Sequence, residues 1–105
     1  MAVDATLSAS GGWLDRHTAA APEALRGRVF EHVALAPAGA GDVALLAAAA
    51  RGALDRVVTR PGDRSVAIDL LAADGLITLA LLRQSELDPG GLAAFARGLT
   101  ERPPR

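Results

Sequence analysis

Few side chains in this sequence carry the chemistry that catalysis or metal binding needs. The two histidines, His17 and His32, have the carboxylates Asp15 and Glu31 close by in the chain. Imidazole together with carboxylate suits several transition metals. However, no His-x-x-x-His or Glu-x-x-His spacing puts two such ligands on one helical face. The pattern therefore favours ordinary surface or boundary histidines, and we predict neither a metal nor another cofactor.

Three polar residues, Asp69, Asp74 and Thr78, interrupt an otherwise apolar stretch. Two carboxylates removed from water could serve as general acid and base. At about 100° per residue, Asp74 and Thr78 share one helical face while Asp69 lies roughly opposite, so one copy cannot aim both carboxylates at a single substrate. We therefore favour a structural role, in which a buried aspartate pairs with an arginine of another helix and fixes register or oligomeric state. The candidate arginines are Arg26, Arg51, Arg56 and Arg97.

The helix that must position these residues spans about residues 64–87, the most apolar part of the chain. Its apolar residues form two stripes at helical spacing, and a helix that is apolar all round is normally buried all round. Its longest uncharged run, residues 75–82, is much shorter than the roughly 18–20 residues of a membrane span. We therefore predict a buried core helix here, and no contact with a membrane. The stripes are Val66, Leu70, Ala73, Ile77 and Leu81, and Ile68, Leu71, Leu79 and Leu82.

Capping residues and helix breakers predict the other helices. Pro and an acidic residue suit the first turn of a helix, and Asp or Ser suits the position before it. The fold class expected is all-α, a small antiparallel bundle of four main helices plus a short N-terminal helix. The expected starts are Ser10 for the short helix through His17, Pro22-Glu23, Asp42 for a helix over residues 43–59, and Asp88-Pro89 for a helix over residues 92–100. We assign residues 13–101 to one domain, residues 1–12 to a flexible arm and residues 102–105 to a disordered tail.

Composition excludes several classes of function. The chain has 105 residues, no cysteine and a formal net charge of −1. The absence of cysteine removes thiol nucleophiles and thiolate metal sites, and the lack of a basic block argues against nucleic-acid binding. Residues 1–12 lack the charged and apolar regions of a secretory signal, so we expect a cytoplasmic protein.

The over-apolar helix and the missing catalytic constellation favour a small homo-oligomeric interaction module without catalytic activity of its own. Three helices of one chain are too few to cover the central helix, and a symmetric dimer would complete its burial. The candidate interface residues are Trp13, Leu71, Ile77 and Leu81, although for Trp13 we favour a position that covers its own core over an anchor in a neighbouring groove. One alternative is a small-molecule pocket or small enzyme using His32, Asp69 or Asp74, and another is an accessory or antitoxin-like partner of a larger protein.

Overall fold

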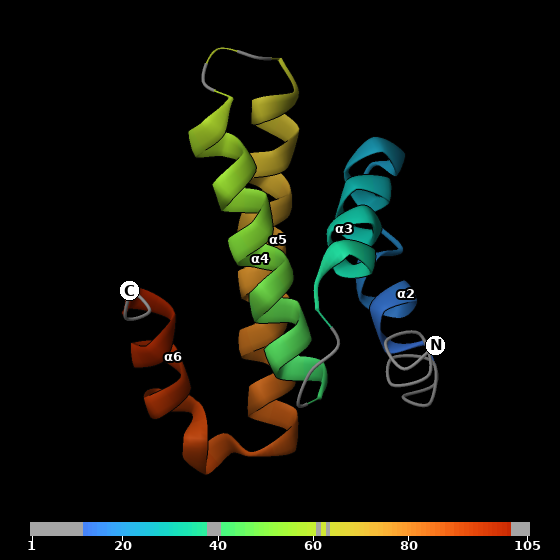
Figure 1. Cartoon of the computed structure of the whole chain (residues 1–105). Helices are drawn as coiled ribbons and strands as arrows, with labels where there is room; N and C mark the ends of the chain where they lie inside the picture. Colours follow the sequence, from blue (N-terminus) through green and yellow to red (C-terminus); the bar gives the residue numbers. More distant parts are fainter. Residues whose placement is uncertain (1–11, 38–40, 61, 63, 102–105) are drawn as a thin grey trace.

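The computed structural model describes residues 12–37, 41–60, 62 and 64–101. These residues form helices with no strand among them, so the predicted all-α class is confirmed (Figure 1). The predicted arm at residues 1–12, apart from Gly12, and the tail at residues 102–105 lie outside the described residues, as does the expected cap Ser10. The elements are α2 (Trp13–Thr18), α3 (Glu23–Leu35), α4 (Asp42–Thr59), α5 (Ser65–Leu87), the 3₁₀ helix η1 (Pro89–Gly91) and α6 (Leu92–Thr100).

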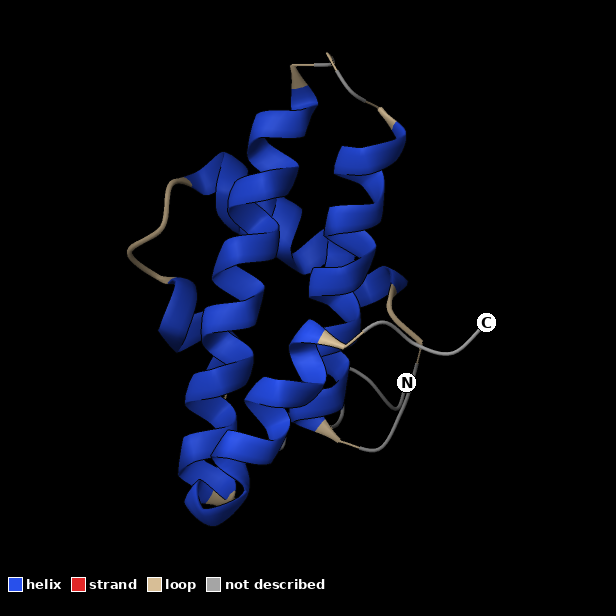
Figure 2. Cartoon of the chain, turned by 90° about the vertical axis from the view of Figure 1, so that its left-hand side faces the viewer, coloured by secondary structure: helices blue, strands red, loops and turns tan. Residues whose placement is uncertain are grey.

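The two longest helices, α4 and α5, lie side by side and form the centre of the molecule (Figures 1 and 2). The chain runs along α4 to Thr59 and returns in the opposite direction along α5 from Ser65. Gly62 has a φ of +90° in this turn, a backbone conformation that a glycine adopts without steric cost. α3 packs against both central helices, while α6 folds back against α5 at the end remote from the turn.

Small side chains allow α4 and α5 to approach each other closely. Their shared core contains no aromatic ring; Leu46 and Leu76 fill the spaces between alanines. Close packing of this kind gains dispersion energy from many short contacts, although each alanine buries little area. The buried alanines are Ala49, Ala50 and Ala53 of α4 and Ala72, Ala73 and Ala80 of α5.

In the single chain, α5 is not buried on all sides, which agrees with the expectation that the helices of one chain are too few to cover it. Leu70 is 50% exposed, Leu71 is 56% exposed and Leu82 is 38% exposed. The reason is geometric, because α4 covers one side of α5, while α3 and the short α6 cover only parts of the rest. A long apolar face of α5 is therefore open to solvent in one copy.

By length and composition alone, α5 is the one helix of the described chain that could also cross a membrane. A core helix of a soluble protein meets the same criteria. The prediction of no membrane contact therefore remains a prediction.

We expect Leu76→Ala to lower the free energy of unfolding by about 2–5 kcal/mol, because it opens a cavity between α4 and α5 where no solvent reaches. Urea unfolding at one fixed protein concentration measures the change. Val58→Ala is the matched control, since Val58 is exposed on α4, and it should change the free energy by no more than roughly 0.5 kcal/mol. Equal effects of the two substitutions would contradict the described core.

Candidate functional site

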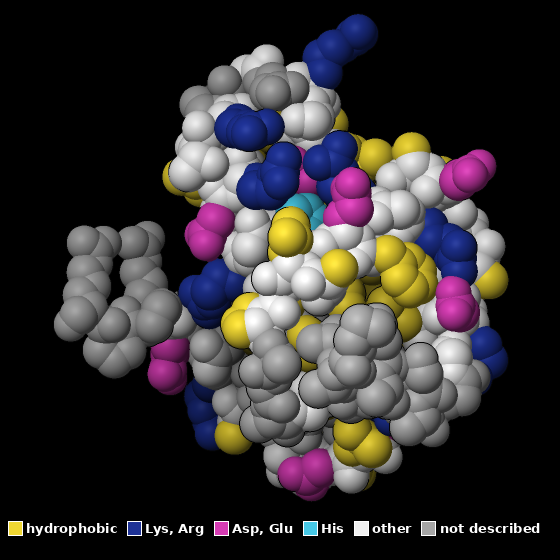
Figure 3. Space-filling view, turned by 45° about the vertical axis from the view of Figure 1, so that its right-hand side comes forward, with side chains coloured by type: hydrophobic (Ala, Val, Ile, Leu, Met, Phe, Trp, Pro, Cys, Tyr) yellow, Lys and Arg dark blue, Asp and Glu magenta, His cyan; other side chains and the backbone are white. Residues whose placement is uncertain are grey.

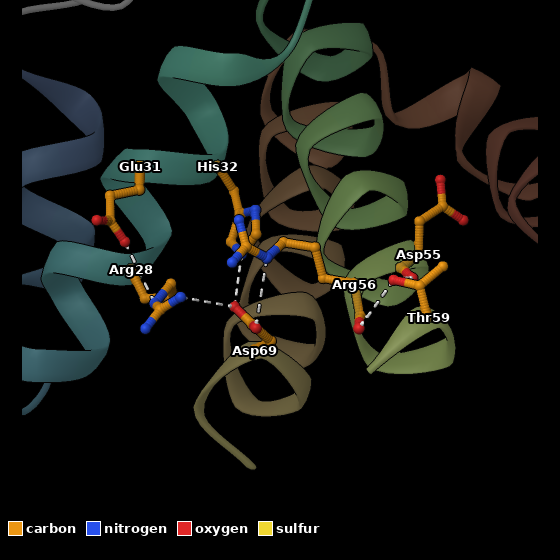
Figure 4. Close-up of polar contacts among 7 residues, drawn as sticks. All are labelled: Arg28, Glu31, His32, Asp55, Arg56, Thr59 and Asp69. Carbon is orange, nitrogen blue, oxygen red and sulfur yellow. Dashed lines mark hydrogen bonds and ion pairs between the residues drawn. The ribbon is translucent and has the colours of Figure 1, made fainter. Parts of the chain in front are cut away.

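A buried carboxylate on α5, that of Asp69, is the meeting point of three helices (Figure 4). Its Oδ1 lies 2.9 Å from Nε2 of His32 and 3.4 Å from Nη1 of Arg28, both on α3. Its Oδ2 lies 3.7 Å from Nε of Arg56 on α4. The side chain of Asp69 is 2% exposed and that of His32 is 3% exposed. A carboxylate so far from water is stable only with such partners.

The local sequence explains how these partners reach Asp69. Arg28 and His32 are four residues apart, so they project from the same face of α3. Glu31 holds the Arg28 guanidinium from the other side, with Nε and Oε2 3.2 Å apart. The side chains of Arg28 and Arg56 are partly exposed to solvent, whereas the imidazole of His32 is buried. We call these four residues, Arg28, His32, Arg56 and Asp69, the Asp69 cluster.

The Asp69 cluster is arranged to hold helices together. In its donor tautomer, the imidazole Nε2–H of His32 donates to the carboxylate, and the two guanidinium groups balance its charge. A general base must present a free acceptor to a substrate, but the acceptors of Asp69 face His32, Arg28 and Arg56 and lie out of reach of solvent. The geometry therefore supports the structural role expected for Asp69 over an acid–base role.

Of the four arginines proposed as partners of Asp69, Arg56 lies beside it, while Arg26 bonds Asp15 and Thr18 instead. Arg28 was missed. Its spacing of four from His32 is the signal that could have identified it, because both side chains must approach the same neighbouring helix.

We expect Asp69→Asn to destabilise the fold by about 3 kcal/mol, since it removes the charge that two guanidinium groups share in a buried setting. The partial exposure of Arg28 and Arg56 keeps the loss at the lower end of the range for buried ion pairs. Urea unfolding again provides the measurement. Asp55→Asn on α4 is the control and should stay within about 0.5 kcal/mol of the parent, because Asp55 is exposed.

A second polar network ties the other end of α5 to α2 and α4. Nε and Nη2 of Arg83 lie 3.0 and 2.9 Å from Oδ2 of Asp42, while Nη1 lies 3.2 Å from Oε1 of Glu86. The indole Nε1–H of Trp13 donates to the same Oε1 of Glu86 at 2.8 Å. Three helices therefore meet here as well, with one guanidinium bridging two carboxylates.

Trp13 belongs to the core of its own chain, with 2% of its surface exposed. Its ring stacks on His17 with centroids 4.1 Å apart, and the Arg83 guanidinium carbon lies 5.3 Å from its centroid. The ring and its N–H are thus both used within the chain, which agrees with the favoured expectation that Trp13 covers its own core.

Asp42 was expected to cap α4, but α4 begins at Asp42 and the preceding residue, Gly41, makes no side-chain cap. The Asp42 carboxylate is instead buried against Arg83. Neither the ion pair between Asp42 and Arg83 nor the hydrogen bond from Trp13 to Glu86 was predicted from the sequence. The i,i+3 spacing of Arg83 and Glu86 is the available sequence signal for their pair.

The Trp13 hydrogen bond, assisted by the Arg83 guanidinium and by His17, lowers the pKa of the Glu86 carboxyl below its ordinary value of 4.5. A depressed pKa in the folded state contributes stability above about pH 4.5, and this contribution is lost as the pH falls through the folded-state pKa.

We therefore expect the parent to lose stability on acidification below about pH 4.5 more steeply than Glu86→Gln, which has no charge to lose at this position. Urea unfolding at a series of pH values, followed by circular dichroism, measures the difference. Glu101→Gln, which removes an exposed carboxyl just after α6, serves as control and should follow the parent. If the free energy of unfolding fell equally for the parent and for Glu86→Gln below about pH 4.5, a stabilising contribution of the Glu86 carboxylate would be contradicted.

Asp74 and Thr78, which the sequence offered as candidate buried polar or pocket residues, both lie on the exposed face of α5. The Thr78 hydroxyl donates to the main-chain carbonyl of Asp74 at 3.0 Å. Since Asp69 occupies the opposite face of the helix, no position of α5 brings both aspartates to one substrate. Among the predicted pocket residues, only His32 and Asp69 are brought together.

The predicted interface residues of α5 are less buried than His32 and Asp69. Leu71 is exposed, whereas Ile77 and Leu81 are half-buried and Ile77 packs against the core.

The described part of the chain contains no group of three or more His, Asp or Glu side chains arranged to hold a metal. On the face shown in Figure 3, basic side chains gather in one region with acidic side chains and a histidine among them, so charges of both signs are mixed there.

Comparison of this chain with protein families, with curated proteins and with solved structures gave no match.

Proposed function

We propose that this protein is a cytoplasmic assembly module, an antiparallel helical bundle that forms a homodimer and has no catalytic activity of its own. The observation that carries the proposal is the open face of α5, where large apolar side chains contact solvent. Contiguous exposed apolar surface on a small protein is typical of an interaction site. We call this surface the outer face of α5 and define it by Ala67, Leu70, Leu71, Asp74, Thr78 and Leu82, all of them exposed.

Burial of this face would stabilise the protein because about 25 cal/mol is gained for each Å² of apolar surface removed from water. The core of a single copy is modest, since among the described residues six of the thirteen buried apolar side chains are alanines. A chain with a small core gains most from oligomerisation. A second copy supplies an identical apolar surface at the same concentration, which makes self-association the simplest way to cover the outer face.

Two features support a protein partner over lipid. Asp74 lies within the outer face, and a carboxylate facing acyl chains is costly, whereas a protein surface can offer it a hydrogen-bond donor. Asp69, on the opposite side of α5, is committed to partners on α3 and α4. The polar residues of α5 thus suit a helix packed between protein surfaces.

We expect Leu71→Arg to shift the protein from dimer to monomer, because it places a charge in the outer face without disturbing the core. The measurement is molar mass by light scattering after size exclusion, across a range of concentrations. Leu35→Arg is the matched control, since Leu35 is also exposed but lies at the end of α3, and it should leave the dimer intact.

A parent chain that is monomeric at every concentration would overturn the proposal, as would a Leu71→Arg variant with the parent's mass. Binding of the parent chain to neutral phosphatidylcholine vesicles, abolished by Leu71→Arg, would assign the outer face to lipid and also contradict the homodimer.

A further inference from the structure

We infer that two copies pair α5 against α5 in opposite directions, so that Asp74 of each copy meets Thr78 of the other. This inference rests on the proposed homodimer and specifies its geometry. Its starting point is a seam along α5 with successive spacings of four and three residues, of which the first four members belong to the exposed outer face and the last two, Leu81 and Ser85, are half-buried. The seam consists of Ala67, Leu71, Asp74, Thr78, Leu81 and Ser85. None of these six residues is fully buried in the single chain.

Alternating spacings of four and three are those of two helices that pack along a common seam. The exposed leucines Leu70 and Leu82 lie on the two sides of the seam, about 60° from its centre at 100° per residue. They would shield the polar centre of the seam from water, as apolar residues beside a hydrogen-bonded pair do at interfaces.

The seam reads almost the same in both directions. If a second copy runs the opposite way about the level of Leu76, Leu71 faces Leu81 of the second copy and Ala67 faces Ser85 of the second copy. Large residues then meet large residues and small residues meet small ones. Under the same operation Asp74 faces Thr78 of the second copy, and a two-fold axis produces every one of these pairs twice.

The polar pair also selects the direction of pairing. Two parallel helices in register would place Asp74 against Asp74, two like charges removed from water, which is costly. In the opposite direction each carboxylate meets a hydroxyl. The Thr78 hydroxyl now donates to the Asp74 carbonyl of its own helix, and rotation about one bond would aim it at the carboxylate of the second copy.

This self-complementarity is the reason to assign the outer face to a second copy of the chain. A different protein would need no such match between the two halves of the seam. The polar pair would also favour one register. A shift of seven residues in one direction sets the Asp74 carboxylate against Leu71, and the same shift in the other direction sets the Thr78 hydroxyl against Leu81.

Cysteine cross-linking tests this geometry, since the chain contains no cysteine of its own. The variants are Ala67→Cys and Ser85→Cys, both on the outer part of α5. We expect an equimolar mixture of the two, exchanged and then oxidised, to give a disulfide-linked dimer that joins Cys at position 67 to Cys at position 85. Each variant alone should stay uncross-linked, because its two thiols would lie at opposite ends of the paired helices, well beyond disulfide reach.

Light scattering on the same samples separates failure of this geometry from failure of the proposed function. Dimers in which each variant cross-links to itself would show parallel helices and overturn the inference, while the homodimer would stand. If the mixture is dimeric by mass but gives no cross-link, the interface lies away from this seam, and the inference is overturned. Monomers throughout would overturn the proposed function itself.

A second pair of variants tests the polar contact. Thr78→Asp would set two carboxylates against each other twice in the dimer, and we expect its dissociation constant to rise by at least about tenfold. The double variant Asp74→Thr/Thr78→Asp restores a carboxylate opposite each hydroxyl and should recover most of that loss. Circular dichroism confirms that each variant remains helical. An unchanged dissociation constant for Thr78→Asp would overturn the inference.

Discussion

The buried carboxylate of Asp69 is the constraint on which the arrangement of the main helices depends. It lies on the most apolar helix of the chain, where an unpaired charge would cost several kcal/mol. Its partners come from α3 and α4, so the charge is satisfied only when all three helices are in place. Apolar packing between alanines is tolerant of small rotations and shifts, whereas a carboxylate held by one hydrogen bond and two ion pairs is not. Asp69 therefore specifies which of several similar packings the helices adopt.

Arg83 acts on α5 in the same way nearer its other end. It lies 14 residues after Asp69, about four turns further along the helix, and on nearly the same face. Its guanidinium bridges Asp42 of α4 and Glu86, which also accepts the indole N–H of Trp13. With two polar contacts fixing the inner face of α5, its rotation is set. The opposite face, with Asp74 and Thr78 at its middle, is consequently the face that remains for a partner.

The sequence predicted the helices well because their signals are local. Proline and glycine breaks, and acidic residues in first turns, determine where helices begin and end whatever the tertiary packing. The helical wheel also showed that Asp69 and Asp74 face opposite ways. Which of the two is buried did not follow, because leucines surround both and the choice depends on where Arg28 and Arg56 lie in space.

The contacts of Trp13 and Asp42 were beyond sequence reasoning for a related reason. A carboxylate before a helix suits a cap, and a lone tryptophan suits an interface anchor. Both rules were overridden by one long-range partner, Arg83, which is 41 residues from Asp42 in the chain. Spacing within a helix can show that Arg83 and Glu86 are neighbours, but it carries no information on which other helix approaches them.

The alanines between α4 and α5 have a consequence for how the fold responds to temperature. Alanine loses no side-chain rotamer entropy on burial, so each one contributes to the core without the entropic cost that larger residues carry. It also hides little apolar surface, and the heat-capacity change of unfolding rises with the apolar surface exposed. A core rich in alanine should therefore have a shallow stability curve, in which the free energy of unfolding varies little between cold and warm conditions.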